Sequence, residues 1–166
     1  MNVSTTVSKR NRASKRSQKG LAAVEMTIIL PVMLMMFIAT AEVGKFLYDY
    51  NTLTKAERNG ARFLAANAQV GKAGDAAADT GVGGYAYRAT NLIVYGDITS
   101  GGTPLLNGLS IDDVTITAPT DELIQVSVTY DYTPIMFATF AGFGFNQTNL
   151  QIPITSTVTM RALRGG

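Results

Sequence analysis

The stretch LAAVEMTIILPVMLMMFIATA, Leu21–Ala41, decides how this chain is organised. It is apolar throughout except for one charged residue, Glu25. At about 1.5 Å rise per residue, a helix of this length extends for roughly 31 Å, close to the ~30 Å hydrocarbon core of a bilayer. The stretch therefore predicts a membrane-spanning helix that carries a single carboxylate near its start.

The segment before this helix carries only positive charge. Its charged residues are all basic: Lys9, Arg10, Arg12, Lys15, Arg16 and Lys19. Positive charge next to a membrane helix is retained on the cytoplasmic side. We therefore predict a cytoplasmic N-terminus and an extracytoplasmic C-terminal part, and the formal net charge of +2 conceals an acidic chain after residue 20.

A cleaved secretory signal is an alternative interpretation of the same stretch, because Ala39-Thr40-Ala41 resembles a small-residue cleavage site. The apolar stretch is longer than the usual ~7–15-residue apolar region of a signal peptide, and it contains both Glu25 and Pro31. These features count against cleavage. An uncleaved signal anchor remains open, since length does not reject it.

Glu25 allows two interpretations. An ionised side chain deep in a bilayer costs about 2.5–3.5 kcal/mol on insertion scales, so such a residue usually has a partner. Near the start of the helix, however, the carboxylate could reach the headgroup region. Glu25 is thus either a tolerated interfacial carboxylate or a charge that pairs with a cation of another subunit.

The N-terminal pattern is a basic leader, then Gly20, then LAAVE and an apolar run. This pattern is similar to the N-terminus of type IV pilins and pseudopilins, in which a membrane aspartyl protease cuts after the glycine. The fifth residue of the mature chain in that family is a glutamate. The resemblance implies cleavage between Gly20 and Leu21, and pairing of Glu25 with the free amine of a neighbouring subunit's Leu21 during assembly.

The helix is expected to continue beyond the membrane through EVGKFLYDYNTLTKAERNGARFLAANAQ, residues 42–69, which contains no proline. We predict one helix from about Leu21 to about Gln69, roughly 70 Å long, with Pro31 bending its axis and Gly71 and Gly74 ending it. Apolar residues recur at three- and four-residue steps and predict one apolar face: Val43, Phe46, Leu47, Tyr50, Leu53, Leu64 and Ala68.

From about Gly20 to Ala66 the sequence closely resembles TadE-like proteins, the minor pilins or pseudopilins of tight-adherence (Flp-type IV) pili. Glu57 departs from the family pattern, which often has a small residue there, and could alter the packing. The positions that match the family motif are Glu42, Gly44, Lys45, Asn51, Leu53, Ala56, Arg58, Gly60, Ala61 and Arg62.

Arg58 and Arg62 lie four residues apart and form a basic stripe on the predicted helix. The stripe is either solvated or directed at the chain's own domain, or it contacts acidic groups of a neighbouring subunit. Nucleic-acid binding is not expected, because the exported part is acidic and has no dense basic patch.

After the long helix we predict a flexible linker over 71–84, a short helix over Tyr85–Tyr95 and three strands over Leu109–Ala118, Leu123–Tyr132 and Ile152–Met160. The aromatic segment Ile135–Phe145 either covers the sheet or forms an exposed patch for lipid or a neighbouring subunit. The predicted fold is α+β and pilin-like: a long N-terminal helix, first transmembrane and then amphipathic, packs on a small antiparallel sheet. The expected parts are a cleaved leader (1–20), a transmembrane or fibre-core helix (21–41), an amphipathic extension (42–70), the linker and a head domain (85–166).

The sequence carries no recognisable catalytic site. Cysteine and histidine are both absent, which excludes disulfides, thiol nucleophiles, the usual zinc sites and histidine acid–base chemistry. The acidic residues Asp112, Asp113, Asp121 and Glu122 lack the spacing and sharp glycine turn of a calcium loop. We expect no enzymatic activity, no metal and no cofactor.

These features together predict a single-pass protein of the bacterial cytoplasmic membrane, also able to enter the extracellular pilus. The resemblance implies a minor pilin that is processed by a prepilin peptidase and assembles with other pilins and pilus assembly proteins. The main alternative is a signal-anchored extracytoplasmic binding domain that never polymerises. An exported hydrolase is a third class, without a supporting motif.

Overall fold

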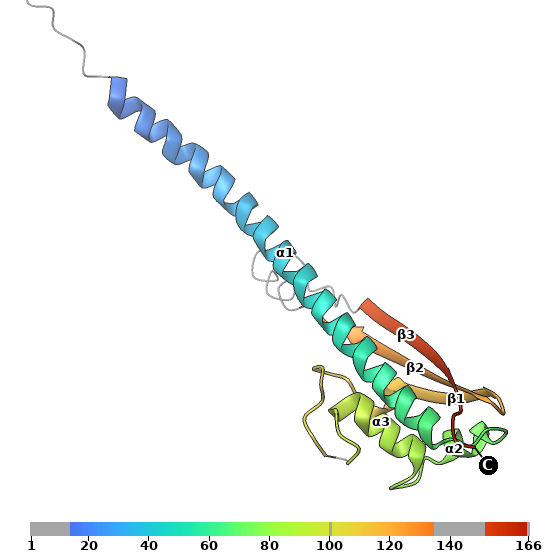
Figure 1. Cartoon of the computed structure of the whole chain (residues 1–166). Helices are drawn as coiled ribbons and strands as arrows, with labels where there is room; N and C mark the ends of the chain where they lie inside the picture. The colour runs from blue at the N-terminus through green and yellow to red at the C-terminus, as the bar shows by residue number, and fades with distance from the viewer. Residues whose placement is uncertain (1–13, 100, 135–151, 166) are drawn as a thin grey trace, which may run out of the picture. The chain divides into compact units, whose positions relative to one another are not determined.

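The computed structural model describes residues 14–99, 101–134 and 152–165. The chain divides into two compact units, Met1–Ala41 and Glu42–Gly166, and we call the second the head unit. The elements, shown in Figure 1, are α1 (Ser14–Asn67), α2 (Ala73–Ala78), α3 (Tyr85–Tyr95), a 3-10 turn η1 (Ile111–Asp113), β1 (Val114–Thr120), β2 (Leu123–Tyr132) and β3 (Ile152–Arg161). The predicted α+β class is confirmed.

The long helix predicted from periodicity is present as α1, which ends at Asn67 and contains Pro31. It is long and apolar enough to cross a membrane, and its most apolar window has a mean hydropathy of 2.3 and is not buried by the described residues. The hydroxyls of Thr27 and Thr40 donate to the carbonyls of Ala23 and Met36, at 2.8 and 2.9 Å. The helix therefore satisfies its own hydroxyl groups, as an apolar environment requires.

The sheet has the order β1-β2-β3 with both pairs antiparallel. Val126 of the central strand β2 pairs with Ile116 of β1 and Val158 of β3. Alternate residues of β2 are buried, as the alternating sequence predicted: Ile124, Val126, Val128, Tyr130 and Tyr132. Within the head unit, the part of α1 after Glu42 runs beside the sheet and α3 lies next to it (Figure 1). Residues from these elements form one core cluster, which includes Leu53, Leu64, Ala68, Ala89, Ile93 and Val94.

The first predicted strand was placed too early. Residues 109–113 do not belong to the sheet, because Ser110 and Asp113 form a capping box that starts η1. The Ser110 amide donates to Asp113 Oδ2 at 2.7 Å, and the Asp112 amide donates to Ser110 Oγ at 3.2 Å. Two of the clustered acids thus lie in a turn whose geometry favours this local pairing over strand formation.

The segment 71–84, for which we expected a flexible linker, contains α2, whose Ala73 and Ala76 are buried. The segment 71–84 also binds the first turn of α3 through hydrogen bonds to Asp79. Asp79 accepts hydrogen bonds from the Tyr85 amide through its carboxylate, at 2.9 Å, and from the Ala86 amide through its carbonyl, at 3.1 Å. The small side chains that suggest a linker also allow this close packing.

The residues after β3 return to the end of α1. The Leu163 amide donates to the Ala65 carbonyl at 2.9 Å, and the Arg164 amide donates to the Ala68 carbonyl at 3.1 Å. Val70 donates in turn to the Arg164 carbonyl at 2.9 Å. These bonds satisfy carbonyl groups that a helix terminus otherwise leaves without an intrahelical partner.

The aromatic segment Ile135–Phe145 lies outside the described residues, and its two interpretations stay predictions.

Candidate functional site

The predicted processing and assembly residues Gly20, Leu21, Glu25 and Pro31 all lie in α1. Glu25 is exposed, and the Leu21 side chain is 74% exposed. The first unit thus presents an apolar helix surface with one carboxylate near its beginning. The roles assigned to these residues depend on a neighbouring subunit and stay predictions.

The start of the head unit contains a buried polar cluster that connects α1 to the end of β2. Glu42 and Tyr132 are both buried, and the Tyr132 hydroxyl donates to the Glu42 carboxylate. Burial, and then this hydrogen bond, raise the pKa of the Tyr132 hydroxyl well above its ordinary value. The tyrosine therefore stays protonated and can act as a donor at any physiological pH.

Lys45 and Asp49 complete this cluster. The Lys45 ammonium lies 2.8 Å from Asp49 Oδ2 and 4.3 Å from the centroid of the Tyr132 ring. The Phe46 ring meets the same tyrosine edge-on, with 5.3 Å between centroids. Asp49 is buried, so an ion pair and a cation–π contact compensate the desolvation of these charges.

A second buried carboxylate lies further along the helix at Glu57, which is 0% exposed. Ser156 of β3 donates to its Oε2 atom, whereas Oε1 has no hydrogen-bond partner among the described residues. Burial raises the pKa of Glu57, and the bonds from Ser156 and the Val158 backbone oppose this rise only in part. The residue that departs from the family pattern is therefore a buried ionisable group in the helix–sheet contact.

This burial predicts a pH dependence of stability. Because the pKa of Glu57 is raised in the folded state, the folded chain retains a proton that the unfolded chain loses as the pH rises above about 4.5. The free energy of unfolding should therefore decrease from acidic pH towards the raised pKa and then level off. We expect Glu57→Gln to remove this decrease and to be more stable than the unchanged protein at neutral pH.

Urea unfolding between pH 4 and pH 8, followed by the tyrosine signal in near-ultraviolet circular dichroism, measures this effect. Asp75→Asn serves as a control, because Asp75 is exposed. An identical pH profile for Glu57→Gln and the unchanged protein would show that the pKa of Glu57 is the same in the folded and the unfolded chain.

The motif residues of the head unit divide between two faces of α1. The inward ones are buried or partly buried and build the contacts with the sheet and α3: Glu42, Lys45, Leu53, Ala56, Gly60 and Ala61. Gly60 permits a close approach, because a Cβ atom there would collide with the Ile93 side chain and lie 3.1 Å from the Ala89 carbonyl oxygen. The outward ones are exposed: Gly44, Asn51, Arg58 and Arg62. The basic stripe is thus not directed at the core of its own domain, and its contact with a neighbouring subunit stays a prediction.

The predicted apolar face of the helix is correct in its later part and, in its earlier part, for Phe46, which packs against the core. Leu53, Leu64 and Ala68 are buried, whereas Val43 and Leu47 are 59% and 52% exposed. Glu42 and Asp49 occupy the inward positions instead, because the Glu42 carboxylate accepts a hydrogen bond from Tyr132 and Asp49 forms an ion pair with Lys45. The spacing of Glu42, Lys45 and Asp49 indicates that they share one helix face, but their partner Tyr132 is 90 residues from Glu42 along the chain.

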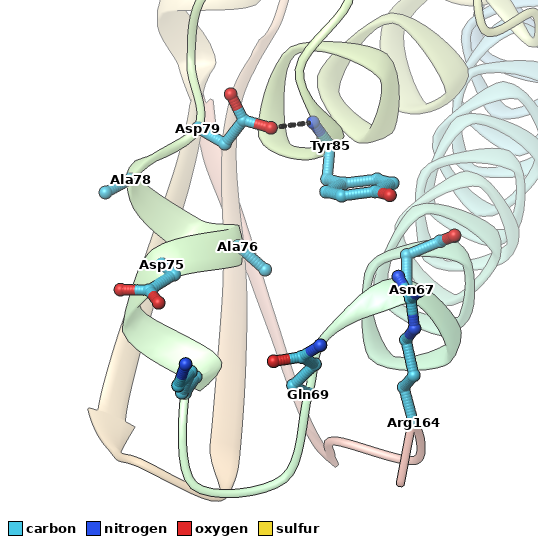
Figure 2. A pocket seen from close by; sticks show the side chains of 9 residues that line it. Asn67, Gln69, Asp75, Ala76, Ala78, Asp79, Tyr85 and Arg164 are labelled. Atoms are coloured by element: carbon cyan, nitrogen blue, oxygen red, sulfur yellow. Dashed lines mark hydrogen bonds between the residues drawn. The ribbon is translucent and has the colours of Figure 1, made fainter. Parts of the chain in front are cut away.

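A groove of about 490 Å³ lies between the end of α1, α2 and Arg164, with Asp79 and Tyr85 on its opposite wall (Figure 2). Its lining mixes both signs of charge, from Lys72, Asp75, Asp79 and Arg164. Asp79 is already engaged with the Tyr85 amide. Among the described residues, no group of three or more acidic side chains could hold a metal ion.

A protein-family model described as TadE-like protein matches residues 20–62. This segment is TadE-like. The match begins at the glycine of the predicted cleavage site and ends at Arg62, so it includes α1 through both the apolar stretch and the motif positions. No curated protein and no solved structure matches the chain. The resemblance to TadE-like proteins is confirmed for α1, and the rest of the head unit has no counterpart in these comparisons.

Proposed function

We propose that this protein is a minor pilin, or pseudopilin, of a tight-adherence pilus system. The TadE-like match of residues 20–62 supports an association with such pili and not with an enzyme family. The observation that carries the finer proposal is the uncovered apolar part of α1, in which Glu25 follows Gly20 at the pilin spacing. An apolar helix surface of this length requires lipid or neighbouring helices as its environment.

In this proposal the chain begins as a single-pass membrane protein with a cytoplasmic leader and an extracytoplasmic head unit. A prepilin peptidase removes residues 1–20, and residues 21–41 then pass from the membrane into the core of an assembling fibre or its initiating complex. The partners are other pilins and pilus assembly proteins. The inward motif residues hold the head unit on α1, and Glu25 supplies the charge for assembly.

The mature N-terminus tests the processing step. We expect N-terminal sequencing of the protein purified from its native membrane to begin at Leu21. A start at Glu42 would show secretion after signal cleavage, and a start at Met1 would show an uncleaved anchor. Either of these two results would contradict the pilin proposal.

We expect Glu25→Ala to insert into the membrane normally but to be strongly reduced in pili or in pilin complexes. A carboxylate that is paired with an amine in a low-dielectric environment contributes several kcal/mol when its partner would otherwise stay unpaired. The amounts in the membrane fraction and in sheared pili, compared by immunoblot, measure the two steps separately.

Thr27→Ala is a matched control, because it removes a polar group of the same helix whose hydroxyl donates to the Ala23 carbonyl within that helix. Normal assembly of Glu25→Ala would rule out the pairing. Failure of Thr27→Ala to assemble would show that the assay reports helix damage in general.

A further inference from the structure

The first turns of α1 in the head unit have an inverted distribution of polarity. Between residues 42 and 51, all charged side chains lie on the side of Tyr132: Glu42 and Asp49 are buried, and Lys45 lies over the Tyr132 ring. The exposed side of the same segment is apolar, with Val43 59%, Leu47 52%, Tyr48 69% and Tyr50 42% exposed. A helix on the surface of a water-soluble domain has the opposite arrangement.

The length of the apolar helix surface can be compared with the thickness of a bilayer. A helix between Glu25 and Glu42 extends for only about 24 Å, which is less than the ~30 Å hydrocarbon core of a bilayer. Glu42 and Asp49 are buried within the head unit, and Lys45, whose side chain is 31% exposed, is paired with Asp49. The next fully exposed charged side chain after Glu25 is therefore Lys55. From residue 26 to residue 54 the helix surface without an unpaired exposed charge extends for about 43 Å, and a bilayer with its headgroup regions measures about 40–45 Å.

The residue types of the exposed surface fit the same location. Tyrosine is enriched where a membrane helix meets the headgroups, because its ring is apolar and its hydroxyl can reach water. Tyr48 and Tyr50 lie directly before the positions at which the exposed face becomes cationic, at Lys55, Arg58 and Arg62. The order along the helix is therefore apolar, then aromatic, then charged.

We infer that the exposed surface of α1 formed by Val43, Leu47, Tyr48 and Tyr50 contacts phospholipid while the protein resides in the membrane. The head unit then begins within the bilayer interface, and the burial of Glu42 and Asp49 against Tyr132 and Lys45 keeps their charges away from the lipid. This inference rests on the proposed insertion of α1 into the membrane. Lipid is favoured over a second protein chain because the surface is continuous with the apolar helix and completes the thickness of a bilayer.

The chain contains no cysteine, so a nitroxide label can be placed at one position at a time. We would label Leu47→Cys, Met33→Cys as the lipid reference and Arg62→Cys as the aqueous reference, all exposed side chains in the full chain. The variants are reconstituted at low protein density into vesicles of phosphatidylcholine and phosphatidylglycerol. Electron paramagnetic resonance then compares collisions of each label with oxygen, which enters lipid, and with a water-soluble nickel chelate.

We expect the ratio of oxygen to nickel accessibility at position 47 to exceed that at position 62 by several-fold and to approach that at position 33. A ratio at position 47 equal to that at position 62, with position 33 in lipid, would overturn this inference and leave membrane insertion intact. Protection of position 47 from both reagents would also overturn it, because another protein chain would then cover the surface. An aqueous signal at position 33 would contradict membrane insertion itself and this inference with it.

A second measurement avoids the label. The chain contains no tryptophan, so Leu47→Trp and the reference Tyr87→Trp on α3 each provide a single indole. We expect brominated phospholipids to quench the fluorescence of Leu47→Trp strongly and that of Tyr87→Trp only weakly. Equal, weak quenching of both variants would contradict the lipid contact.

Discussion

Gly60→Val is expected to destabilise the head unit by about 3 kcal/mol or more, at the upper end of the cost of overpacking a filled core. Position 60 lies on α1 against Ile93 and Ala89 of α3. Even the first atom of a side chain there would collide with Ile93, and the Ala89 carbonyl oxygen would lie 3.1 Å from it. Ile93 is itself fully buried, so the neighbouring side chain cannot move away without disturbing the core.

Gly44→Val is the matched control, since a Cβ atom at Gly44 meets nothing within 4 Å and both glycines lie in the same helix. Both substitutions make a similar change in helix propensity, and only Gly60→Val adds atoms to a packed contact. Urea unfolding of the full chain in detergent, followed by tyrosine circular dichroism, reports on the head unit because all tyrosines of the chain follow residue 42. Equal unfolding midpoints for the two variants would show that α1 and α3 do not pack as described.

Tyr132→Ala is expected to cost about 3–5 kcal/mol, as is typical when a buried aromatic side chain is truncated. The ring contacts Phe46 and Lys45, and its hydroxyl donates to Glu42, so one residue holds three side chains of α1 against the end of β2. Tyr132→Phe keeps the ring and removes only the hydroxyl, and should cost about 1–3 kcal/mol because the buried Glu42 carboxylate loses a donor.

The difference between the two variants separates the contribution of ring packing from that of the hydrogen bond. Tyr48→Ala serves as a control, because Tyr48 is 69% exposed and its loss should change stability by less than about 0.5 kcal/mol. Equal destabilisation by Tyr132→Phe and Tyr132→Ala would assign the whole effect to the hydroxyl. No destabilisation by either would contradict the described contact between α1 and β2.

The elements that could be predicted from the sequence are those whose signal is local and repeated. The absence of proline between Pro31 and residue 69 and the apolar periodicity predicted α1, and strict alternation predicted β2. The start of β1 was predicted wrongly because the hydrogen bond between Ser110 and Asp113 forms the turn η1. The strand begins only after this turn, at Val114. The linker prediction missed α2, because a stretch rich in alanine and glycine is compatible both with a flexible segment and with a tightly packed helix.

The polar cluster of the head unit could not be predicted for a different reason. Periodicity indicates which residues share a helix face, but it does not tell which face is covered by the domain. Helical spacing relates Val43 to Leu47 and also Glu42 to Asp49. Which of the two pairs is buried depends on Tyr132, which is far away in sequence. The assembly residues Gly20 and Glu25 were predicted from family resemblance, because their proposed function requires a second molecule.

The return of residues 162–164 to the end of α1 has a consequence for biogenesis. Ala162 is buried, and the amides of Leu163 and Arg164 donate hydrogen bonds to the carbonyls of Ala65 and Ala68. A chain that is translocated from its N-terminus delivers α1 to the membrane early, whereas these closing residues arrive after β3. In the proposed insertion, the inward face of α1 therefore stays without these contacts until β3 and the residues after it have followed, so the head unit cannot complete its packing while only α1 has entered the membrane.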